Sequence, residues 1–311
     1  MIFRRPPLKR ALLTPAVLAG LLVGLPGCSM KKAAVDTVGT AILEGDTTYA
    51  RDDDPELVAA AAPFGLKTVE GLLETSPENE ALLLSAASGF TGYAYAFVQC
   101  EADYVEAKDL ARATELRARA KRLYRRARAY GLRGLEVRHR GFPERLRTDT
   151  ASALAGMETR DAPFLYWTSA AWGSEISLSK GEAELTADQG LVEALARRAL
   201  ALDEAFRAGA LHDFFIAWEG GRPPSAGGSP RKAKEHLDRA LVLSRGQRAA
   251  PLVTYAESVL VASQDRAAFE ETLKQALEID PERDPRFRLE NFVARKRARW
   301  LLSRTSELFL E

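Results

Sequence analysis

The chain has 311 residues, with 44 lysines and arginines against 43 acidic residues, 46% hydrophobic residues and two cysteines. This ordinary balance excludes a collagen-like, low-complexity or wholly disordered chain, and two cysteines are too few for a disulfide-rich scaffold. A formal net charge of +1 carries no whole-chain signature of nucleic-acid binding. The length allows one large domain or two medium ones, in either case with a substantial buried core.

The N-terminal segment has the pattern of a bacterial lipoprotein signal. Residues 1–27 contain four cations and no acid, and a largely apolar run covers residues 11–24. This run is shorter than the roughly 20 apolar residues that span a bilayer, and it predicts a signal peptide over residues 1–27. The tetrapeptide Leu25-Pro26-Gly27-Cys28 resembles a lipobox, which predicts that Cys28 is lipidated. The alternative is a plain secretory signal with a chance cysteine.

A lipidated Cys28 would anchor the protein stably, because two or more acyl chains hold a membrane where one chain does not. Ser29 follows at a position where inner-membrane lipoproteins often carry Asp, so we expect an outer-membrane anchor that faces the periplasm. Residues 28–51 are expected to form the tether. No later segment is expected to be long and apolar enough to span a membrane. Cys100 ends an apolar run beside acidic residues and is expected to be a buried, unreactive thiol.

From residue 52 onward the sequence predicts an all-α protein. Strand-like alternation and hairpin turn signals are nearly absent. Five sites place a capping side chain directly before a proline, a common helix start because proline has no N–H to leave unbonded. Thr75 and Glu78 offer an alternative capping box, one residue before the site at Ser76. The five sites are Asp54-Pro55, Ser76-Pro77, Ser229-Pro230, Asp280-Pro281 and Asp284-Pro285.

Apolar stripes at helical spacing predict the buried faces of three helices. Ala240 and Ala276, in two of the stripes, are 36 residues apart, close to the tetratricopeptide period of about 34 residues. We therefore expect one domain over residues 52–311, built as a tetratricopeptide-like array of helical hairpins, with the Gly-rich stretch 220–228 as an insertion between repeats. The stripes are Leu116, Ala120, Leu123, Tyr124 and Ala127; Ala233, Leu237, Ala240 and Leu241; and Phe269, Leu273, Ala276 and Leu277.

No motif for catalysis or metal binding is found in the sequence. The three histidines are far apart, no cluster has zinc-ligand spacing, and neither a nucleophile elbow nor a P-loop occurs. His236 lies between acidic neighbours and is expected on an exposed helical face. The sequence therefore predicts a protein that is not an enzyme and that uses no cofactor or metal.

A dense basic stretch runs from Arg117 to Arg128, with seven cations in twelve residues on the faces that the apolar stripe leaves free. One interpretation is a solvated face paired with acids such as Glu115 or Glu136. The other is a docking surface for an acidic protein or for lipid phosphates. The same choice applies to Arg297 and its basic neighbours. Nucleic acid is not an expected partner, because the signal directs the chain out of the cytoplasm.

Three aromatic clusters stand at helical spacing, and core packing is the ordinary explanation of each. The alternative is a mixed apolar and polar pocket, since buried Tyr and Trp side chains need a polar partner. From the first two clusters we select Tyr93, Phe97, Trp167 and Trp172 as candidate ligand-lining residues. The full clusters are Phe90, Tyr93 and Phe97; Phe164, Trp167 and Trp172; and Phe214, Phe215 and Trp218.

Several segments together resemble the TatT family, the T-component lipoproteins of tripartite ATP-independent periplasmic (TRAP) transporters. The resemblance covers roughly residues 40–311, almost the whole chain after the predicted signal. As a set these segments are specific, although each alone is a weak signal. They are residues 52–58, 63–68, 83–98, 166–172, 203–212 and 232–241.

The resemblance implies an all-helical, tetratricopeptide-like protein tethered by lipid in the periplasm. It further implies association with the transporter's substrate-binding P-component, a homotrimer, and a hydrophobic cleft or pore for a small organic ligand. The family has no catalytic residues to carry over. The alternative is a structural lipoprotein that scaffolds envelope assembly and has no small-molecule site.

Overall fold

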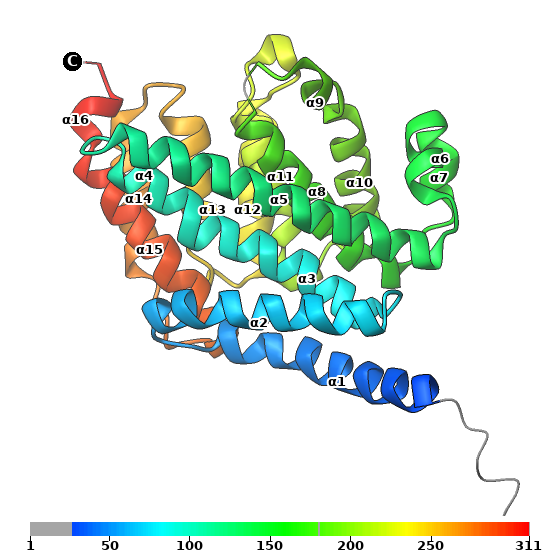
Figure 1. The fold of residues 1–311 in the computed structure, drawn as a ribbon. Helices are drawn as coiled ribbons and strands as arrows, with labels where there is room; N and C mark the ends of the chain where they lie inside the picture. The colour runs from blue at the N-terminus through cyan, green and yellow to red at the C-terminus, as the bar shows by residue number, and fades with distance from the viewer. Residues whose placement is uncertain (1–26, 180, 311) are drawn as a thin grey trace, which may run out of the picture.

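The computed structural model describes residues 27–179 and 181–310, and every regular element in these two ranges is a helix (Figure 1). The prediction of an all-α protein is confirmed for this part of the chain. Residues 1–26 of the predicted signal peptide lie outside the described residues. Cys28 lies in the first turn of helix α1, with its side chain outside the described part.

The helices fall into two halves along the chain. The first half contains α1 (Gly27–Ala50), α2 (Pro55–Thr75), α3 (Glu80–Tyr93), the π-helical segment η1 (Ala94–Gln99), α4 (Cys100–Val105), α5 (Leu110–Arg138), α6 (Phe142–Thr148), α7 (Thr150–Ala155), the 3₁₀ turn η2 (Thr159–Asp161) and α8 (Ala162–Ser177). The second half contains α9 (Ala183–Ala187), α10 (Gln189–Leu202), η3 (Phe206–Ala208), α11 (Ala210–Gly220), η4 (Pro224–Ala226), α12 (Pro230–Leu243), α13 (Ala250–Tyr255), the π-helical segment η5 (Ala256–Leu260), α14 (Arg266–Glu278), η6 (Pro285–Phe287), α15 (Arg288–Ser303) and α16 (Thr305–Leu308).

Three of the five predicted helix starts are confirmed. Asp54 caps α2 by accepting hydrogen bonds from the backbone N–H groups of residues 56 and 57, and Ser229 caps α12. Asp284 caps the short η6, which leads into α15. Asp280 instead accepts a hydrogen bond from the N–H of Glu282 in a turn, because the competing start at Asp284 follows only four residues later.

The predicted start at Ser76, and its alternative at Thr75, are both wrong. Helix α3 begins at Glu80, and the Asn79 side chain caps it by accepting from the N–H of residue 82. The Ser76 hydroxyl and the Asn79 amide both donate to the Asp36 carboxylate of α1, at 2.5 and 2.8 Å. A tertiary contact to α1 therefore uses the hydroxyl that the local pattern assigned to a cap.

In the first half the long helix α5 packs between α3 and α8, and α10 covers the other side of α8 (Figure 1). The predicted stripe from Leu116 to Ala127 is confirmed as the buried face of α5, with Leu123 half-buried. Two glycines allow α5 and α8 to approach closely. A Cβ on Gly134 would lie 2.1 Å from the Phe164 ring, and one on Gly131 would lie 2.2 Å from the Thr168 hydroxyl. Such distances are far below ordinary van der Waals contact, so glycine is required at this seam.

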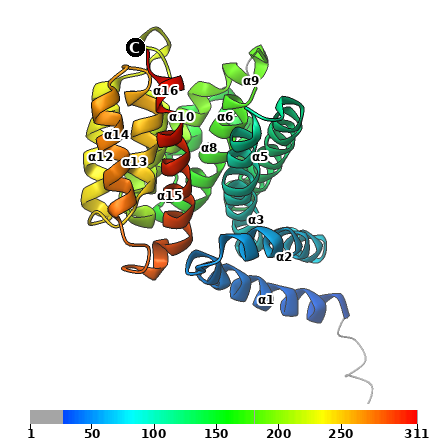
Figure 2. The same cartoon turned by 90° about the vertical axis from the view of Figure 1, so that its left-hand side faces the viewer.

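The second half has its own hydrophobic core, built by α11 to α16. The stripes on α12 and α14 are confirmed as buried faces, with Leu241 and Leu277 partly buried at their edges. Helix α15 packs on α13 and α14 and also contacts α1 and α2 of the first half. Figure 2 shows α12 to α15 on one side and α3 and α5 on the other, with α8 and α10 between them.

The helix that runs through α3, η1 and α4, Glu80–Val105, has 26 residues and is apolar enough to cross a membrane by length and composition alone. The expectation that no segment after Cys28 has these properties is therefore wrong. More than half of its most apolar stretch, 56%, is buried inside the protein. Leu82, Leu83 and Phe90 lie in the hydrophobic core, which is the environment of a core helix.

Cys100 is the buried residue that the sequence predicts, at 2% exposure. Burial raises the pKa of its thiol to about 12. Only a negligible thiolate fraction is therefore present near neutral pH, which agrees with an unreactive side chain.

Candidate functional site

The four aromatic residues selected from the sequence lie on two helical segments, Tyr93 and Phe97 on the segment of α3 and η1, and Trp167 and Trp172 on α8. Tyr93 and Phe97 are half-buried neighbours on one long helix, with ring centroids 5.8 Å apart. The Arg119 guanidinium lies 5.7 Å from the Tyr93 ring and donates a hydrogen bond to its hydroxyl at 3.3 Å. Their assignment as ligand-lining residues stays a prediction.

The two tryptophans of α8 lie in different environments. Trp167 is half-buried, packs edge-on against Tyr166 and is covered by the Arg207 guanidinium at 5.5 Å. Trp172 is 1% exposed, and the guanidiniums of Arg128 and Arg147 lie 4.9 and 5.7 Å from its ring. Trp172 therefore lies beneath a pair of arginines, and these arginines line a cavity.

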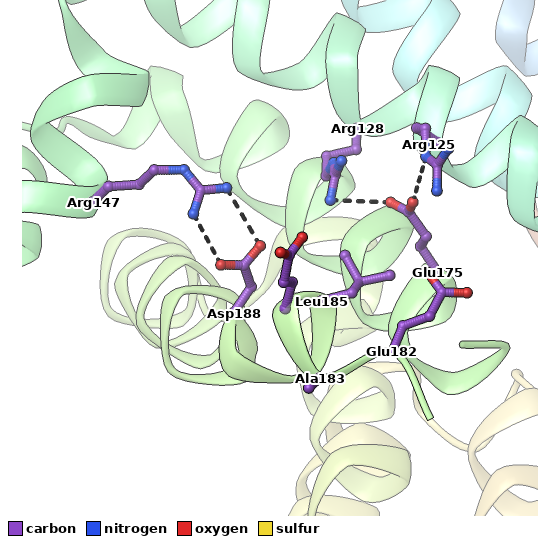
Figure 3. A pocket seen from close by; sticks show the side chains of 9 residues that line it. Arg125, Arg128, Arg147, Glu175, Glu182, Ala183, Leu185 and Asp188 are labelled. Atoms are coloured by element: carbon purple, nitrogen blue, oxygen red, sulfur yellow. Dashed lines mark hydrogen bonds and ion pairs between the residues drawn. The ribbon is translucent and has the colours of Figure 1, made fainter. Parts of the chain in front are cut away.

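This cavity, the arginine cleft, has a volume of about 700 Å³ and lies where α5, α6, α8 and the segment around α9 meet (Figure 3). Its volume is within the range of small-molecule sites, roughly 300–1,000 Å³. The lining residues are Arg125, Arg128, Arg147, Glu175, Glu182, Ala183, Glu184, Leu185 and Asp188.

Glu175 is the centre of one side of the cleft. Its side chain is fully buried, accepts a hydrogen bond from Arg125 Nε at 2.8 Å and lies 3.1 Å from Arg128 Nη1 (Figure 3). Burial of an ionised carboxylate is costly without cationic partners. One turn of α5 supplies both arginines, because residues three apart in a helix lie on neighbouring faces.

On the opposite side Arg147 of α6 pairs with Asp188 through both terminal nitrogens, at 3.0 and 3.3 Å (Figure 3). This is a bidentate pair, which fixes the guanidinium plane. The Lys121 ammonium pairs with Glu182 at the edge of the cleft. These two ion pairs connect the segment that carries α9 to the body of the protein, because α9 itself buries no side chain fully.

Arg128 is the most strongly affected cation of the cleft. Burial lowers the pKa of its guanidinium, and the charges of Arg125 and Arg147 lower it further, against the opposing effect of Glu175 and Asp188. Arg128 Nη1 is buried and ion-paired with Glu175 at 3.1 Å, although this contact lacks the geometry of a hydrogen bond, and the indole Nε1 of Trp172 is buried without a hydrogen bond to any described residue. Polar atoms in this state are uncommon in folded proteins. The indole N–H of Trp172 is therefore a buried donor without a partner among the described residues, whereas Arg128 is committed to Glu175.

A second group of buried arginines joins the two halves of the molecule. Arg297 of α15 is 7% exposed, contacts Asp103 of α4 at 2.9 Å, also pairs with Glu257 of η5 and lies 4.2 Å from the Trp300 ring. We call this set of four residues the clasp. Arg117 of α5 reaches Asp103 from the other side, also at 2.9 Å.

The basic stretch of α5 is therefore mostly paired with acids of other helices. Neither acid expected from the sequence takes that role: Glu115 pairs with Arg112, and Glu136 accepts hydrogen bonds from the N–H groups of residues 141 and 142. Sequence distance explains the difference, because the actual partners lie on α4, α8 and α2 and in the segment before α9.

The expectation that His236 is a solvated surface residue is wrong. Its Nδ1 lies 2.8 Å from Nδ1 of His212, and its ring stacks on Phe215. His212 is 6% exposed, and its Nε2 lies 3.2 Å from the Glu204 carboxylate. The hairpin of α11 and α12 brings the two histidines together across 24 residues, which no local spacing indicates. Within the described ranges no group of three or more His, Cys, Asp or Glu side chains is placed to hold a metal ion.

Sequence reasoning did not select Glu175, Arg147 or Asp188 as site residues. Glu175 follows Trp172 by three positions, so one turn of α8 carries both the covered indole and the buried carboxylate. The available signal in the sequence was Glu175 itself, the lone acidic residue of α8. To interpret it, one must know that α8 packs against the basic helix α5, and the sequence alone does not give that pairing.

Comparison with known proteins assigns the chain to a family. The model of the TRAP transporter T-component family, TAtT, matches residues 51–309. The chain is also 28% identical, over 306 residues, to an uncharacterized protein of Treponema pallidum (strain Nichols), covering 92% of this chain and 94% of that protein. The family match includes the helices from α2 to α16, the arginine cleft and the clasp. The chain belongs to the TAtT family, the T-component family of TRAP transporters.

Proposed function

We propose that this protein is a periplasmic lipoprotein that binds the substrate-binding P-component of a TRAP transporter. The family match over residues 51–309 carries the proposal, since it indicates association with such a transporter. The lipobox at Cys28 supports an acyl anchor, and Ser29 supports the outer membrane as its location. We assign the protein no catalytic activity, because its family is a transporter component.

In this proposal the lipid on Cys28 confines the helical domain to the membrane surface and raises its effective concentration there. The helices from residue 52 form a tetratricopeptide-like array, which presents a preformed surface to its partner. We further propose a homotrimer, and a small organic ligand that the protein passes to or receives from the P-component. Tyr93, Phe97, Trp167 and Trp172 remain the candidate aromatic residues for that ligand.

For the contact with the P-component we propose the outer face of α2. Leu57 and Phe64 lie seven residues apart on this helix and are 58% and 80% exposed. Ala60 and Ala61 are exposed between them, so an apolar stripe two turns long faces solvent. Exposed apolar patches of this kind are typical of protein interfaces.

The test is a pull-down from periplasmic extract with the full chain as bait and mass spectrometry of the captured proteins. We expect the P-component to be enriched, and Phe64→Ser to reduce its recovery while Lys67→Ser, an exposed change on the same helix, leaves it intact. Enrichment of envelope-assembly proteins without a P-component would contradict the proposal in favour of a scaffold. If Phe64→Ser instead disrupts a homotrimer, the stripe is a contact between copies.

The anchor is tested separately by cell fractionation. Cys28→Ser removes the acylation site and is expected to move the protein from the membrane fraction to the periplasmic one. Ser29→Asp is the matched variant, because it keeps the cysteine and is expected to redirect the protein to the inner membrane. A Cys28→Ser protein that stays in the membrane fraction would show that the anchor assignment is wrong.

A further inference from the structure

We propose that a second cavity, the loop cavity, binds the phosphate group of a small polar molecule. It lies where the turn between α12 and α13 meets the loop before η6 and the segment of η3. Its volume of about 630 Å³ is within the range of small-molecule sites. The proposal is independent of the transporter partner proposed above. Among the residues that line the loop cavity are Ala208, Arg245, Gln247, Arg283, Asp284 and Arg286.

The charges of the loop cavity favour an anion. Three arginines line it, Arg245, Arg283 and Arg286, against a single acid, Asp284. Arg286 holds Asp284 through Nε and Nη2, at 3.0 and 2.6 Å, so the one lining carboxylate already has its cation. Two guanidiniums remain without a counter-charge, one on each of two loops. The arginine cleft differs, because there three arginines face four acids.

The donors of Arg245 and Arg283 are free to bind. Both residues are exposed, and neither has an ion pair, a side-chain hydrogen bond or a ring contact with any described residue. The acids directly next to lining residues in the chain have other partners: Glu204 pairs with an arginine of α12, and Glu282 pairs with one of α15. A guanidinium presents a planar fork of donors that matches the oxygens of a phosphate.

The backbone at Arg245 supports the site independently of charge. The N–H groups of residues 245 and 246 donate to the carbonyls of residues 242 and 241, at 3.1 and 2.8 Å, which forms a Schellman motif at the end of α12. Arg245 takes the left-handed position of this motif, with φ 53°, where glycine is the usual residue. Ala208, on another wall of the cavity, also has a φ of 53°. Strained non-glycine residues of this kind cluster at ligand-binding sites.

The two free guanidiniums match the charge of a phosphate ester, which carries about −1.5 to −2 near neutral pH. The loop cavity is much larger than a phosphate group, so the ligand has a further part. Gln247 is half-buried, and its side-chain amide has no hydrogen bond within the described ranges, so a hydroxyl-bearing body suits this wall. The same phosphate chemistry occurs in a soluble ester and in a phospholipid headgroup, and the experiment separates these two sources.

The experiment is a calorimetric titration of the purified full chain, in non-ionic detergent at neutral pH and low ionic strength, with sn-glycerol 3-phosphate and with dihexanoyl phosphatidate. The matched probes are glycerol, which lacks the phosphate, and acetate, which carries one charge. We expect a phosphate compound to bind at least about tenfold tighter than either probe, since charge-assisted hydrogen bonds have this magnitude. Tighter binding of the phosphatidate assigns the site to a lipid headgroup, and equal or weaker binding assigns it to a soluble ester. Binding of neither phosphate compound, or equal binding of glycerol or acetate, would overturn the proposal.

Arg245→Gly and Arg283→Gln each remove one free guanidinium and are each expected to weaken phosphate binding about tenfold. Arg245→Gly places the usual residue in the left-handed position, so its melting temperature should not fall, which separates lost binding from lost folding. Arg299→Gln is the control, because this exposed arginine of α15 does not line the loop cavity, and it should keep binding within about twofold. Unchanged binding in either cavity variant, or the same loss in the control, would overturn the assignment. Because the titration uses no partner protein, its failure is distinct from failure to capture a P-component.

Discussion

The arginine cleft and the clasp use the same chemistry for different ends. In both, arginine meets carboxylates of other helices and lies over a tryptophan ring. In the clasp Arg297 is 7% exposed and shares its donors between Asp103 and Glu257. In the cleft Arg125 is 56% exposed and contacts a single carboxylate beside an open cavity. Enclosure makes the clasp a structural connection, whereas the terminal nitrogens of Arg125 in the cleft stay exposed to solvent.

We expect the largest loss of stability from a substitution in the clasp. Arg297→Met should lower the free energy of unfolding by about 3 kcal/mol, measured by urea denaturation, because it leaves carboxylates without their buried partner. The value is at the low end for such a loss, since Asp103 keeps Arg117 and Glu257 is 37% exposed. A loss below about 1 kcal/mol would show that the clasp does not hold the two halves together.

The seam between α5 and α8 positions the cleft, and it offers the next test. Gly134→Ala should lower the free energy of unfolding by about 2–3 kcal/mol, because its Cβ would overlap the Phe164 ring. Gly92→Ala is the control: apart from its two chain neighbours and the backbone of its own helix, no atom lies within 4 Å of its Cβ position, so the change should stabilise α3 by about 0.5–1 kcal/mol. Equal changes in the free energy of unfolding for the two variants would mean that α5 and α8 can move apart at no cost.

The contact between His212 and His236 differs from the cleft and the clasp, because it is a polar contact between two side chains that are uncharged at neutral pH. Burial, and then the neighbouring His212, lowers the pKa of His236 from 6.5 to about 4; Arg197 and Lys232 act in the same direction. The unfolded state therefore binds a proton more readily below pH 6.5, and stability falls as the pH drops toward 4. Between pH 7 and 5 we expect a loss of about 2 kcal/mol in the free energy of unfolding.

His236→Gln should remove most of this slope in the same denaturation series. The interval above pH 5 is chosen because the ordinary pKa values of Asp and Glu lie below it. For Glu204, which contacts His212, the hydrogen bond from Arg239 outweighs the effect of burial and lowers the pKa to about 2. A slope that survives in the variant would assign the pH dependence to other groups.

The smallest effect on stability is expected at the exposed arginine of the cleft. Arg125→Gln should change the free energy of unfolding by less than about 1 kcal/mol, because the pair is largely solvated on the arginine side. If Arg125→Gln lowered the free energy of unfolding as much as Arg297→Met, Arg125 would be a structural residue of the cleft, as Arg297 is of the clasp.

Local sequence signals predicted the helices well where local forces decide them. Asp54 and Ser229 cap the expected helices, and the three apolar stripes are buried, because capping and amphipathic spacing act within a turn or two. The same logic failed at Ser76, where a carboxylate 40 residues earlier in α1 takes the hydroxyl. From a single sequence, a serine that caps a helix cannot be told from a serine whose hydroxyl is bonded to a distant carboxylate.

The candidate site was predicted less well for the same reason. The sequence singled out Trp172 as an aromatic residue near a possible ligand and the basic stretch of α5 as a charged face. It did not indicate that the two meet, nor that Glu175 and Asp188 would complete the cleft with Arg147. These partners are separated by 41 to 50 residues, and only the packing of α5 and α10 against α8, with α6 against α5, brings them together.

The sequence by itself determined that the protein is all-helical, which faces of its helices are apolar, and that it resembles the T-component family to which it belongs. These properties follow from short-range spacing and from motifs. The tertiary structure alone decided which arginines are buried, which of them connect distant helices, and which face open space. The reason is physical: the partner of a charged side chain is set by long-range helix packing, and a pattern of residues along one helix carries no record of the helix opposite it.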